Sequence, residues 1–434
     1  MVIPKDTQLK QLRSEPNPNA EVNIGLTESR MSSSFQNSQP PHAIVIGLDS
    51  PQGLQTARIL AHRKIPVIAI AKNPKYYSCR TKVCKEILFT DTATEALISM
   101  LETLGPKLNQ KAVLFPCQDK NVLLISRHRQ KLEQWYHIVL PAPDIIEMMM
   151  DKISFYTYAQ QEGLPIPTIF FLHCRADAEQ AAQKLSYPCI LKPPFRPEAW
   201  TQHTKRKAFK VANPEELLAL YDHYHRWADV LIAQDWIAGP DANLYGCSCY
   251  FDANSQPVVT FVSRKLRQWP PRTGQGCLSE ECRNDLVLHE AVGLFRRVNY
   301  RGLGHLEMKQ DERSGKYYIV EPNIGRPTGR SAIAEAGGVE LLYTMYCDAL
   351  GWPLPANREQ KYEGVKLMHL LRDFQSAWYY WRHGELTLKE WWQSVRGRKA
   401  YVVFSWSDPL PFLNALLTAI PLYLSPREQG QEDY

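Results

Sequence analysis

The alternation of hydrophobic and polar positions predicts a β-hairpin over residues 302–323. Two apolar-alternating runs are joined there by a short polar loop that contains Gly315. Successive side chains of a strand point to opposite faces, so Glu321 and Asn323 share one face of the second strand. If the chain turns at Ser314–Gly315, Glu307 of the first strand lies almost opposite Glu321. The pattern therefore brings two carboxylates and an amide oxygen together.

This trio predicts a metal site. Like charges that face each other across a hairpin are destabilising unless they are neutralised. The oxygen ligands of Glu307, Glu321 and Asn323 suit a hard cation such as Mg²⁺. The alternative is a solvated hairpin whose acids pair with Lys309 or Lys316. A second acid in hairpin register favours the metal interpretation.

Earlier in the chain, residues 42–150 alternate between apolar runs and helical patterns. Buried strands are predicted at 43–46, 66–71 and 112–115. A helical pattern follows the first of them and continues through Leu60. Strands that alternate with helices imply a parallel, doubly wound sheet.

The loop after the first strand raises the question of a dinucleotide site. Gly47 and Gly53 do not form Gly-x-Gly-x-x-Gly, and no acid ends the second strand at Ile70 to receive a ribose. We interpret the loop as a strand-to-helix turn that is free to contact some other substrate. Lys72 could meet a phosphate, so NADP stays open.

A second unit begins near Asp151. Asp151-Lys152 opens a helix that runs to about Glu162. A strand at 169–172 and a helix to Leu185 follow, and the next short buried strand ends at Lys192. A lysine in that position is either a solvent-facing strand end or a cation aimed at a ligand.

The next segment, 195–209, is basic and poor in apolar periodicity, which is typical of a solvated loop or of a lid over phosphates. A buried strand at 230–234 then leads into Gln234-Asp-Trp-Ile-Ala-Gly-Pro-Asp241. Further strands are predicted at 244–251 and 257–263.

The order of these pieces resembles the ATP-grasp superfamily over residues 151–351. Lys152 and Lys192 look like its two nucleotide-binding lysines, and Lys265 looks like the residue that reaches the phosphates. The segment from Gln234 is similar to the hinge of D-alanine–D-alanine ligases. By that likeness the backbone from Asp235 to Ile237 meets the adenine edge and Asp241 meets the ribose. Glu307, Glu321 and Asn323 match the superfamily's magnesium set.

Two features depart from the resemblance. Many members have a glycine-rich loop over the phosphates, whereas residues 193–207 contain no glycine. The usual Glu-x-Asn-Pro-Arg is here Glu321-Pro-Asn-Ile-Gly-Arg326, so the arginine is displaced by one residue. Arg326 and Arg330 follow the metal set in a tight loop before a helix near Ser331. Their fork-shaped guanidinium groups suit a carboxylate or acyl phosphate, although both could instead pair with acids of that helix, Glu335 and Glu340.

Within the superfamily, the chain most resembles a carboxylate–amine ligase branch that includes D-aspartate ligases. This resemblance implies both a fold and a function. The fold class is α/β, with an α+β ATP-grasp module. Four parts are expected: a disordered tail at 1–41, an N-terminal α/β domain at 42–150, the module at 151–350 with lobes at 151–235 and 236–350, and an aromatic-rich extension at 351–434. The implied reaction uses ATP and Mg²⁺, for which Mn²⁺ could substitute, to join a small-molecule carboxylate to an amine through an acyl phosphate. The alternatives are an ATP-grasp enzyme with a non-amine acceptor and a catalytically silent nucleotide-binding regulator or scaffold.

The amino-acid composition indicates which kinds of substrate, partner and cellular compartment to expect. A net charge of +6 spread along the chain favours anionic small substrates and is only a weak argument for nucleic acid, which is not expected as a partner. The ten cysteines form no Cys-x-x-Cys pair, and the tail lacks a signal-peptide apolar core, which together predict a cytoplasmic protein with reduced thiols. The apolar stretch 410–424 is too short and proline-broken to span a bilayer. Docking onto the module is favoured for it over peripheral membrane contact, and a homodimer is compatible with the sequence.

Overall fold

The structure is a computed structural model that describes residues 39–272 and 274–424, without side chains from 419 onward. The predicted disordered tail therefore lies almost wholly outside the described residues. The first unit of the described chain holds a five-stranded parallel sheet in the order β3-β2-β1-β4-β5. Its strands are β1 (Ala43–Ile46), β2 (Val67–Ala71), β3 (Glu86–Phe89), β4 (Ala112–Pro116) and β5 (Tyr136–His137). Its helices are α1 (Pro51–His62), α2 (Ala96–Leu104), α3 (Asp119–Arg127), α4 (Arg129–Leu132) and α5 (Pro143–Met150). This is the predicted doubly wound arrangement.

The loop between β1 and α1 is a tight strand-to-helix turn. Gly47 has a φ of +89°, in the left-handed region that glycine adopts readily, and a Cβ on Gly53 would lie 2.2 Å from the Gly47 carbonyl oxygen. Lys72, which could have met a phosphate, pairs with Asp91 at 2.7 Å. The turn therefore serves close packing of helix on strand.

A smaller lobe follows, with an antiparallel sheet that runs β6-β9-β7-β8 in the described chain. Its strands are β6 (Ile169–Leu172), β7 (Cys189–Lys192), β8 (Phe209–Val211) and β9 (Leu231–Asp235). Its helices are α6 (Lys152–Gln161), α7 (Arg175–Lys184), α8 (Glu198–His203) and α9 (Pro214–Tyr224). The basic segment is thus not simply a loop, because it contains α8. Trp200 of α8 is fully buried and its indole N–H donates to the Arg206 carbonyl at 2.9 Å.

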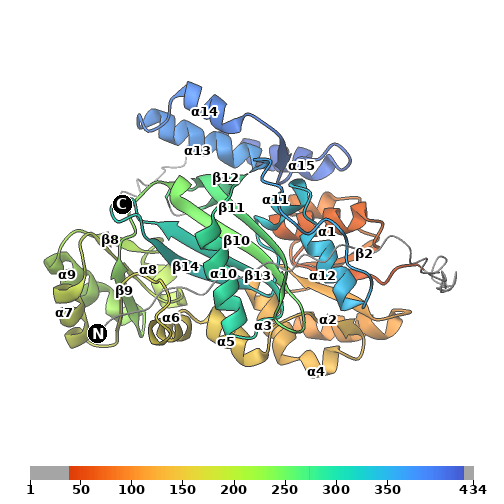
Figure 1. Cartoon of the computed structure of the whole chain (residues 1–434), viewed down its shortest axis with the longest axis horizontal. Coiled ribbons are helices and arrows are strands. Elements are labelled where there is room, and N and C mark those ends of the chain that lie inside the picture. The colour runs from red at the N-terminus through yellow and green to blue at the C-terminus, as the bar shows by residue number, and fades with distance from the viewer. Residues whose placement is uncertain (1–38, 273, 425–434) are drawn as a thin grey trace, which may run out of the picture. The chain divides into compact units, whose positions relative to one another are not determined.

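The larger lobe is built on a sheet in the order β14-β13-β10-β11-β12-β15-β16, as far as the described residues show. Its strands are β10 (Leu244–Phe251), β11 (Pro257–Trp269), β12 (Gln275–Glu281), β13 (Gly302–Gln310), β14 (Tyr317–Ile324), β15 (Lys366–Met368) and β16 (Lys399–Tyr401). Helix α10 (Asp285–Arg297) lies across one face of the sheet (Figure 1), and α11 (Ser331–Ala336) and α12 (Leu341–Ala349) follow β14. Strand β11 continues six residues beyond its predicted end, through two irregularities in its register with β12.

The C-terminal extension continues this sheet, because it contributes β15 and β16. Its helices are α13 (Leu370–Arg382), α14 (Leu388–Val395) and α15 (Leu410–Leu424), blue in Figure 1. Asp373 of α13 is fully buried and pairs with Arg267 of β11 at 2.8 Å. None of the helices in the described part of the chain is long and apolar enough to cross a membrane. Strands β15 and β16 and helix α13 therefore pack on the module, whereas α15, which was predicted to dock there, packs mainly on residues 77–80 of the N-terminal unit. The domain boundaries themselves stay predictions.

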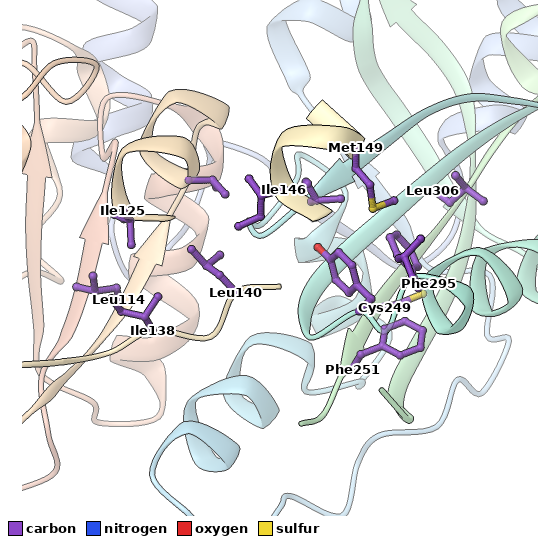
Figure 2. Close-up of a cluster of buried hydrophobic side chains, with 14 of the residues drawn as sticks. Leu114, Ile125, Ile138, Leu140, Ile146, Met149, Cys249, Phe251, Phe295 and Leu306 are labelled. Atoms are coloured by element: carbon purple, nitrogen blue, oxygen red, sulfur yellow. The ribbon is translucent and has the colours of Figure 1, made fainter. Parts of the chain in front are cut away.

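One apolar core joins the N-terminal unit to the larger lobe. Figure 2 shows Leu114, Ile125 and Leu140 of the first unit in the same cluster as Phe251 and Phe295 of the second. Close packing extends to the end of β14, where a Cβ on Gly325 would lie 2.7 Å from the Leu140 side chain. The residues that follow β14 are therefore held against the carboxyl end of the parallel sheet. Crevices at this end of open α/β sheets are where ligands usually bind.

Candidate active site

The hairpin β13–β14 has the register that the sequence predicts. Glu307 pairs directly with Glu321, and His305 pairs with Asn323. The ladder is irregular between Glu307 and Met308, and beyond this point the pairing shifts by one residue. Two carboxylates and an amide therefore lie within one short stretch of the ladder.

Glu307 is neutralised by two cations of the protein. Its carboxylate lies 2.6 Å from the Lys265 ammonium and 3.0 Å from the Arg330 guanidinium, and all three side chains are buried. Burial raises the pKa of Glu307, but Lys265 and Arg330 outweigh that effect and hold the pKa well below its ordinary value. Glu307 is therefore ionised, and the alternative that it pairs with Lys309 or Lys316 is wrong.

Glu321 is exposed and forms no ion pair with any residue that the structure describes. It interacts electrostatically with Lys192, at the end of β7. Burial lowers the pKa of Lys192 to about 8, Lys152 at the start of α6 lowers it as well, and Glu321 opposes both. The Lys192 ammonium also lies 5.8 Å from the centre of the Tyr156 ring. The structure thus brings together both predicted nucleotide-binding lysines and one predicted metal ligand, from three separate elements.

Arg330 has an unsatisfied group at this site. Its Nη1 is buried without a hydrogen-bond partner among the described residues. A Cβ on Gly246 of β10 would lie 2.7 Å from that atom and 2.6 Å from the His305 ring, so glycine makes room for both side chains. Buried unsatisfied donors are rare, and an orphaned guanidinium N–H next to a candidate metal site suits an anionic ligand.

His305 belongs to the same cluster, although no role was predicted for it. Its Nδ1 lies 3.0 Å from the Ser248 hydroxyl, and burial together with Arg330 lowers its pKa to about 3. The imidazole is therefore neutral at physiological pH. Its place on the same strand face as Glu307 is the signal from which the sequence could have identified it.

Arg326 bridges two parts of the chain. Its Nε donates to Asp119, the first residue of α3, at 2.5 Å, and its Nη2 donates to the Asn323 amide oxygen at 2.7 Å. The alternative that Arg326 and Arg330 pair with acids of the following helix is wrong. Those acids, Glu335 and Glu340, instead bind Arg63 at 2.7 and 3.0 Å. Helix α11 is only six residues long, so the arginine side chains and not its dipole carry the expectation of anion binding.

The predicted adenine hinge is partly occupied by contacts within the protein. The Asp235 amide donates to the Thr168 carbonyl at 2.9 Å, and the Trp236 carbonyl accepts from Arg313 at 2.8 Å. The backbone groups of Ile237 have no partner among the described residues. A cavity of about 320 Å³ borders this hinge. Ile237 is therefore the hinge residue best able to meet a ligand.

Two further predicted residues have defined surroundings. Gln234 is buried in β9, and its side-chain oxygen has no partner within the described chain. Asp241 accepts hydrogen bonds from Gln268 at 2.7 Å and from Tyr380 at 2.8 Å, and its burial raises its pKa. Because Tyr380 belongs to α13, the C-terminal extension reaches the predicted ribose contact. No pattern in the sequence predicts that contact.

The donor set fits a magnesium nucleotide. No group of three or more His, Cys, Asp and Glu able to hold a metal occurs in the described part of the chain. A metal at the hairpin therefore depends on Glu307 and Glu321 together with the Asn323 amide, all of them oxygen donors. Several cations surround these donors: Lys152, Lys192, Lys265 and Arg330. Positively charged side chains that outnumber the carboxylates of the site favour the binding of a phosphate group there.

Comparison with known proteins supports the α/β fold with an ATP-grasp module that the sequence predicts. No protein-family model matches the chain. A D-aspartate ligase of Enterococcus faecium is 24% identical over 248 residues, which are 55% of this chain and 58% of that ligase. A D-alanine–D-alanine ligase B of Pseudomonas putida is 24% identical over 191 residues, 41% of this chain and 54% of the relative. The chain thus matches little more than half the length of these curated relatives.

Solved structures match over a longer stretch. The biotin carboxylase of Campylobacter jejuni superimposes with a TM-score of 0.58 at 17% identity, covering 74% of each chain. The N5-carboxyaminoimidazole synthetase of Staphylococcus aureus, solved with ADP, superimposes with a TM-score of 0.58 at 15% identity and covers 74% of this chain and 80% of its own. The fold predicted from the motifs is thereby confirmed: the chain has the ATP-grasp fold, and the curated proteins similar to it include a D-aspartate ligase and a D-alanine–D-alanine ligase.

Proposed function

We propose that this protein is an ATP- and Mg²⁺-dependent ligase that activates a carboxylate as an acyl phosphate and joins it to an amine. The observation that carries the proposal is the hairpin register, which sets Glu307 opposite Glu321 beside a cluster of buried cations. In a solvated hairpin two facing acids repel each other and destabilise the pairing. A metal ion bound between carboxylates and phosphates would remove that repulsion. The similarity to D-aspartate and D-alanine–D-alanine ligases supports the same reaction type.

Each residue has a role in this reaction. Glu307, Glu321 and Asn323 would hold Mg²⁺, which when bound neutralises phosphate charge and orients the transferred group. Lys152 and Lys192 would contact the nucleotide phosphates from the smaller lobe, and Lys265 would contact them from the larger one. The hinge from Gln234 to Ile237 would hold the adenine, and Asp241 the ribose. Such a site acts by positioning and charge stabilisation, so the chain needs no side-chain nucleophile.

Arg326 and Arg330 would bind the acid substrate. A carboxylate oxygen attacks the γ-phosphorus, the bond to the bridging oxygen breaks, and ADP leaves. The amine nitrogen then attacks the acyl carbon, the C–O bond to phosphate breaks, and the nitrogen loses a proton. Arg330 Nη1, which has no partner among the described residues, would stabilise the oxyanion that forms in the second step, when the amine attacks the acyl carbon.

ADP release in a screen of amino acids and amines tests the proposal. We expect release that depends on Mg²⁺, on one carboxylate and on one amine, with one amide formed per ADP. Hydroxylamine in place of the amine should trap the acyl phosphate as a hydroxamate. A hydroxamate without any amine product would favour a non-amine acceptor. ATP binding without turnover by any acid would favour the silent nucleotide-binding alternative and would overturn the proposal.

The proposal also covers the class of substrate, the cellular compartment and the oligomeric state. The substrates would be small molecules, without nucleic acid, in a cytoplasmic protein. A homodimer is compatible with the similarity to a 2-oxoglutarate carboxylase domain solved as a dimer. Gel filtration with light scattering would measure the oligomeric state directly.

A further inference from the structure

A cavity of about 490 Å³ lies between the N-terminal unit and the C-terminal extension, apart from every residue assigned to the ligase reaction. One wall is the segment after β2, from Asn73 to Tyr77. The opposite wall is the start of α13, including His369 and Arg372, and the near face of α15. Its volume falls within the range of small-molecule sites, and its walls come from segments about 300 residues apart in sequence.

Two polar atoms of the walls are buried without a partner. Neither the Tyr77 hydroxyl nor the His369 Nδ1 has a hydrogen-bond partner among the described residues. Burial raises the pKa of Tyr77, and burial together with Arg372 lowers the pKa of His369 to about 4. Both groups are therefore uncharged at physiological pH, and the Tyr76 side chain lies close enough to Tyr77 to raise its pKa further. An orphaned buried polar group is costly unless a ligand or water completes it.

The charged residues among the described lining of the cavity are all positive. Lys75 and Arg372 contribute the charges, and no Asp or Glu is among the lining residues that the structure describes. Arg372 donates one hydrogen bond to Gln275 at 3.0 Å, which leaves most of its guanidinium donors for a ligand. The rest of the wall has an apolar part, made of Leu370, Leu371, Val403, Phe404, Phe412 and Ala415, and four uncharged polar or tyrosine side chains, Asn73, Tyr76, Gln375 and Thr418.

We propose that this cavity binds an amphipathic organic anion, with its carboxylate on Arg372 and Lys75 and its apolar body against α13 and α15. The Tyr77 hydroxyl would donate to the same carboxylate. A molecule with a charged head but no apolar body would leave the aliphatic and aromatic wall in water, and an apolar amine would meet two cations. The cavity therefore selects for both features at once. This site does not depend on the proposed ligase reaction.

Calorimetric titration of the full chain, without nucleotide, tests the site with four probes. Octanoate carries both features, acetate lacks the body, octanol lacks the charge, and octylamine reverses it. We expect octanoate to bind at least tenfold more tightly than each of the other three. Octylamine binding as tight as octanoate would overturn the proposal, and so would octanoate binding no tighter than acetate.

Substitutions assign the binding to this cavity. Arg372→Gln should weaken octanoate about tenfold and leave octanol unchanged, because it removes the charge-assisted contact only. Tyr77→Phe should weaken octanoate severalfold while keeping the ring in place. Arg382→Gln, at the exposed end of the same helix, is the matched control and should bind like the parent. Octanoate affinity that is unchanged in both Arg372→Gln and Tyr77→Phe, in variants that melt at the parent's temperature, would refute the assignment.

Discussion

Glu307 lies directly opposite Glu321 in the β13–β14 ladder, but only Glu307 is neutralised by cations of the protein. Lys265 and Arg330 both contact its carboxylate, whereas Glu321 is exposed and unpaired within the described chain. The two acids should therefore respond differently to substitution. Loss of Glu307 leaves two buried cations without a partner, while loss of Glu321 removes charge from the ligand side of the site.

Glu321→Gln should abolish turnover and leave the fold intact. The amide keeps the shape of the side chain but removes one negative charge from the metal site, so Mg²⁺ affinity should fall. ADP release and thermal melting measure the two effects separately. Glu312→Gln, in the exposed turn of the same hairpin, is the matched control and should retain parental activity. Parental turnover by Glu321→Gln would mean that the metal assignment is wrong.

Nucleotide affinity should depend on pH through Lys192. Its pKa in the free protein is about 8, below the ordinary 10.5, mainly because of burial. Bound phosphates favour the charged form, so above pH 8 binding must take up a proton and affinity should fall by up to about tenfold per pH unit. Below pH 8 the ammonium is already charged and the dependence should vanish. By the same shift, the free energy of unfolding should rise with pH between about 8 and 10.5, because the unfolded chain binds more protons there.

Titration calorimetry with ATP at pH 7, 8 and 9 measures this dependence. Lys192→Met should weaken ATP by roughly 1.5–3 kcal/mol at pH 7, the size of one charge-assisted contact, and should remove the slope above pH 8. Lys184→Met, at the exposed end of α7, should keep both affinity and slope. If the dependence of ATP affinity on pH above pH 8 is unchanged in Lys192→Met, Lys192 does not contact the nucleotide and only ends the strand.

Gly246→Ala should destabilise the protein and disturb Arg330. Its Cβ would lie 2.6 Å from the His305 ring, closer than real contacts allow. Overpacking of this kind typically costs about 1–3 kcal/mol. Gly293, inside α10, has open space around its would-be Cβ, so Gly293→Ala should instead stabilise by about 0.4–1 kcal/mol. Urea unfolding of the pair measures both signs, and equal effects would show that the contact with His305 is unimportant.

Arg326→Lys should raise the KM for the carboxylate substrate about tenfold and leave the KM for ATP within about twofold. The lysine keeps the charge but loses the fork that reaches Asp119 and Asn323 at once. Arg127→Lys, on the exposed face of α3, is the control and should not change either constant. If carboxylate kinetics are untouched in Arg326→Lys, the acid site should be sought nearer the turn from Gly47 to Gly53.

Local patterns identified much of this architecture. The run at 43–46 and the strand at 244–251 have the bounds that the sequence predicts, because short apolar runs between turn residues determine them. The approximate hairpin register followed from alternation and the position of the turn, and a shift between Glu307 and Met308 then sets Glu307 directly opposite Glu321. Helix α8 was missed because the one large apolar residue within its six positions is Trp200, whose burial depends on neighbours elsewhere in the lobe.

Contacts between distant segments could not be predicted in this way. Asp119 is 207 residues from Arg326, and Tyr380 is 139 residues from Asp241. Neither pair leaves a periodic signal, since each depends on how separate sheets pack. The same holds for Arg330, whose pairing with Glu307 instead of Glu335 is decided by the space that Gly246 provides.

Asp373→Ala should cost roughly 3–5 kcal/mol, the usual effect of removing one partner from a buried ion pair. Asp373 is fully buried and accepts from Arg267 at 2.8 and 3.0 Å and from the Trp391 indole at 3.3 Å. The variant leaves the Arg267 guanidinium buried with its charge uncompensated. The double variant Arg267→Met, Asp373→Leu removes both charges and should lose much less stability. Urea unfolding of both variants makes the comparison. A loss below about 1 kcal/mol in Asp373→Ala would mean that the extension is a loosely attached appendage and not part of the module's sheet.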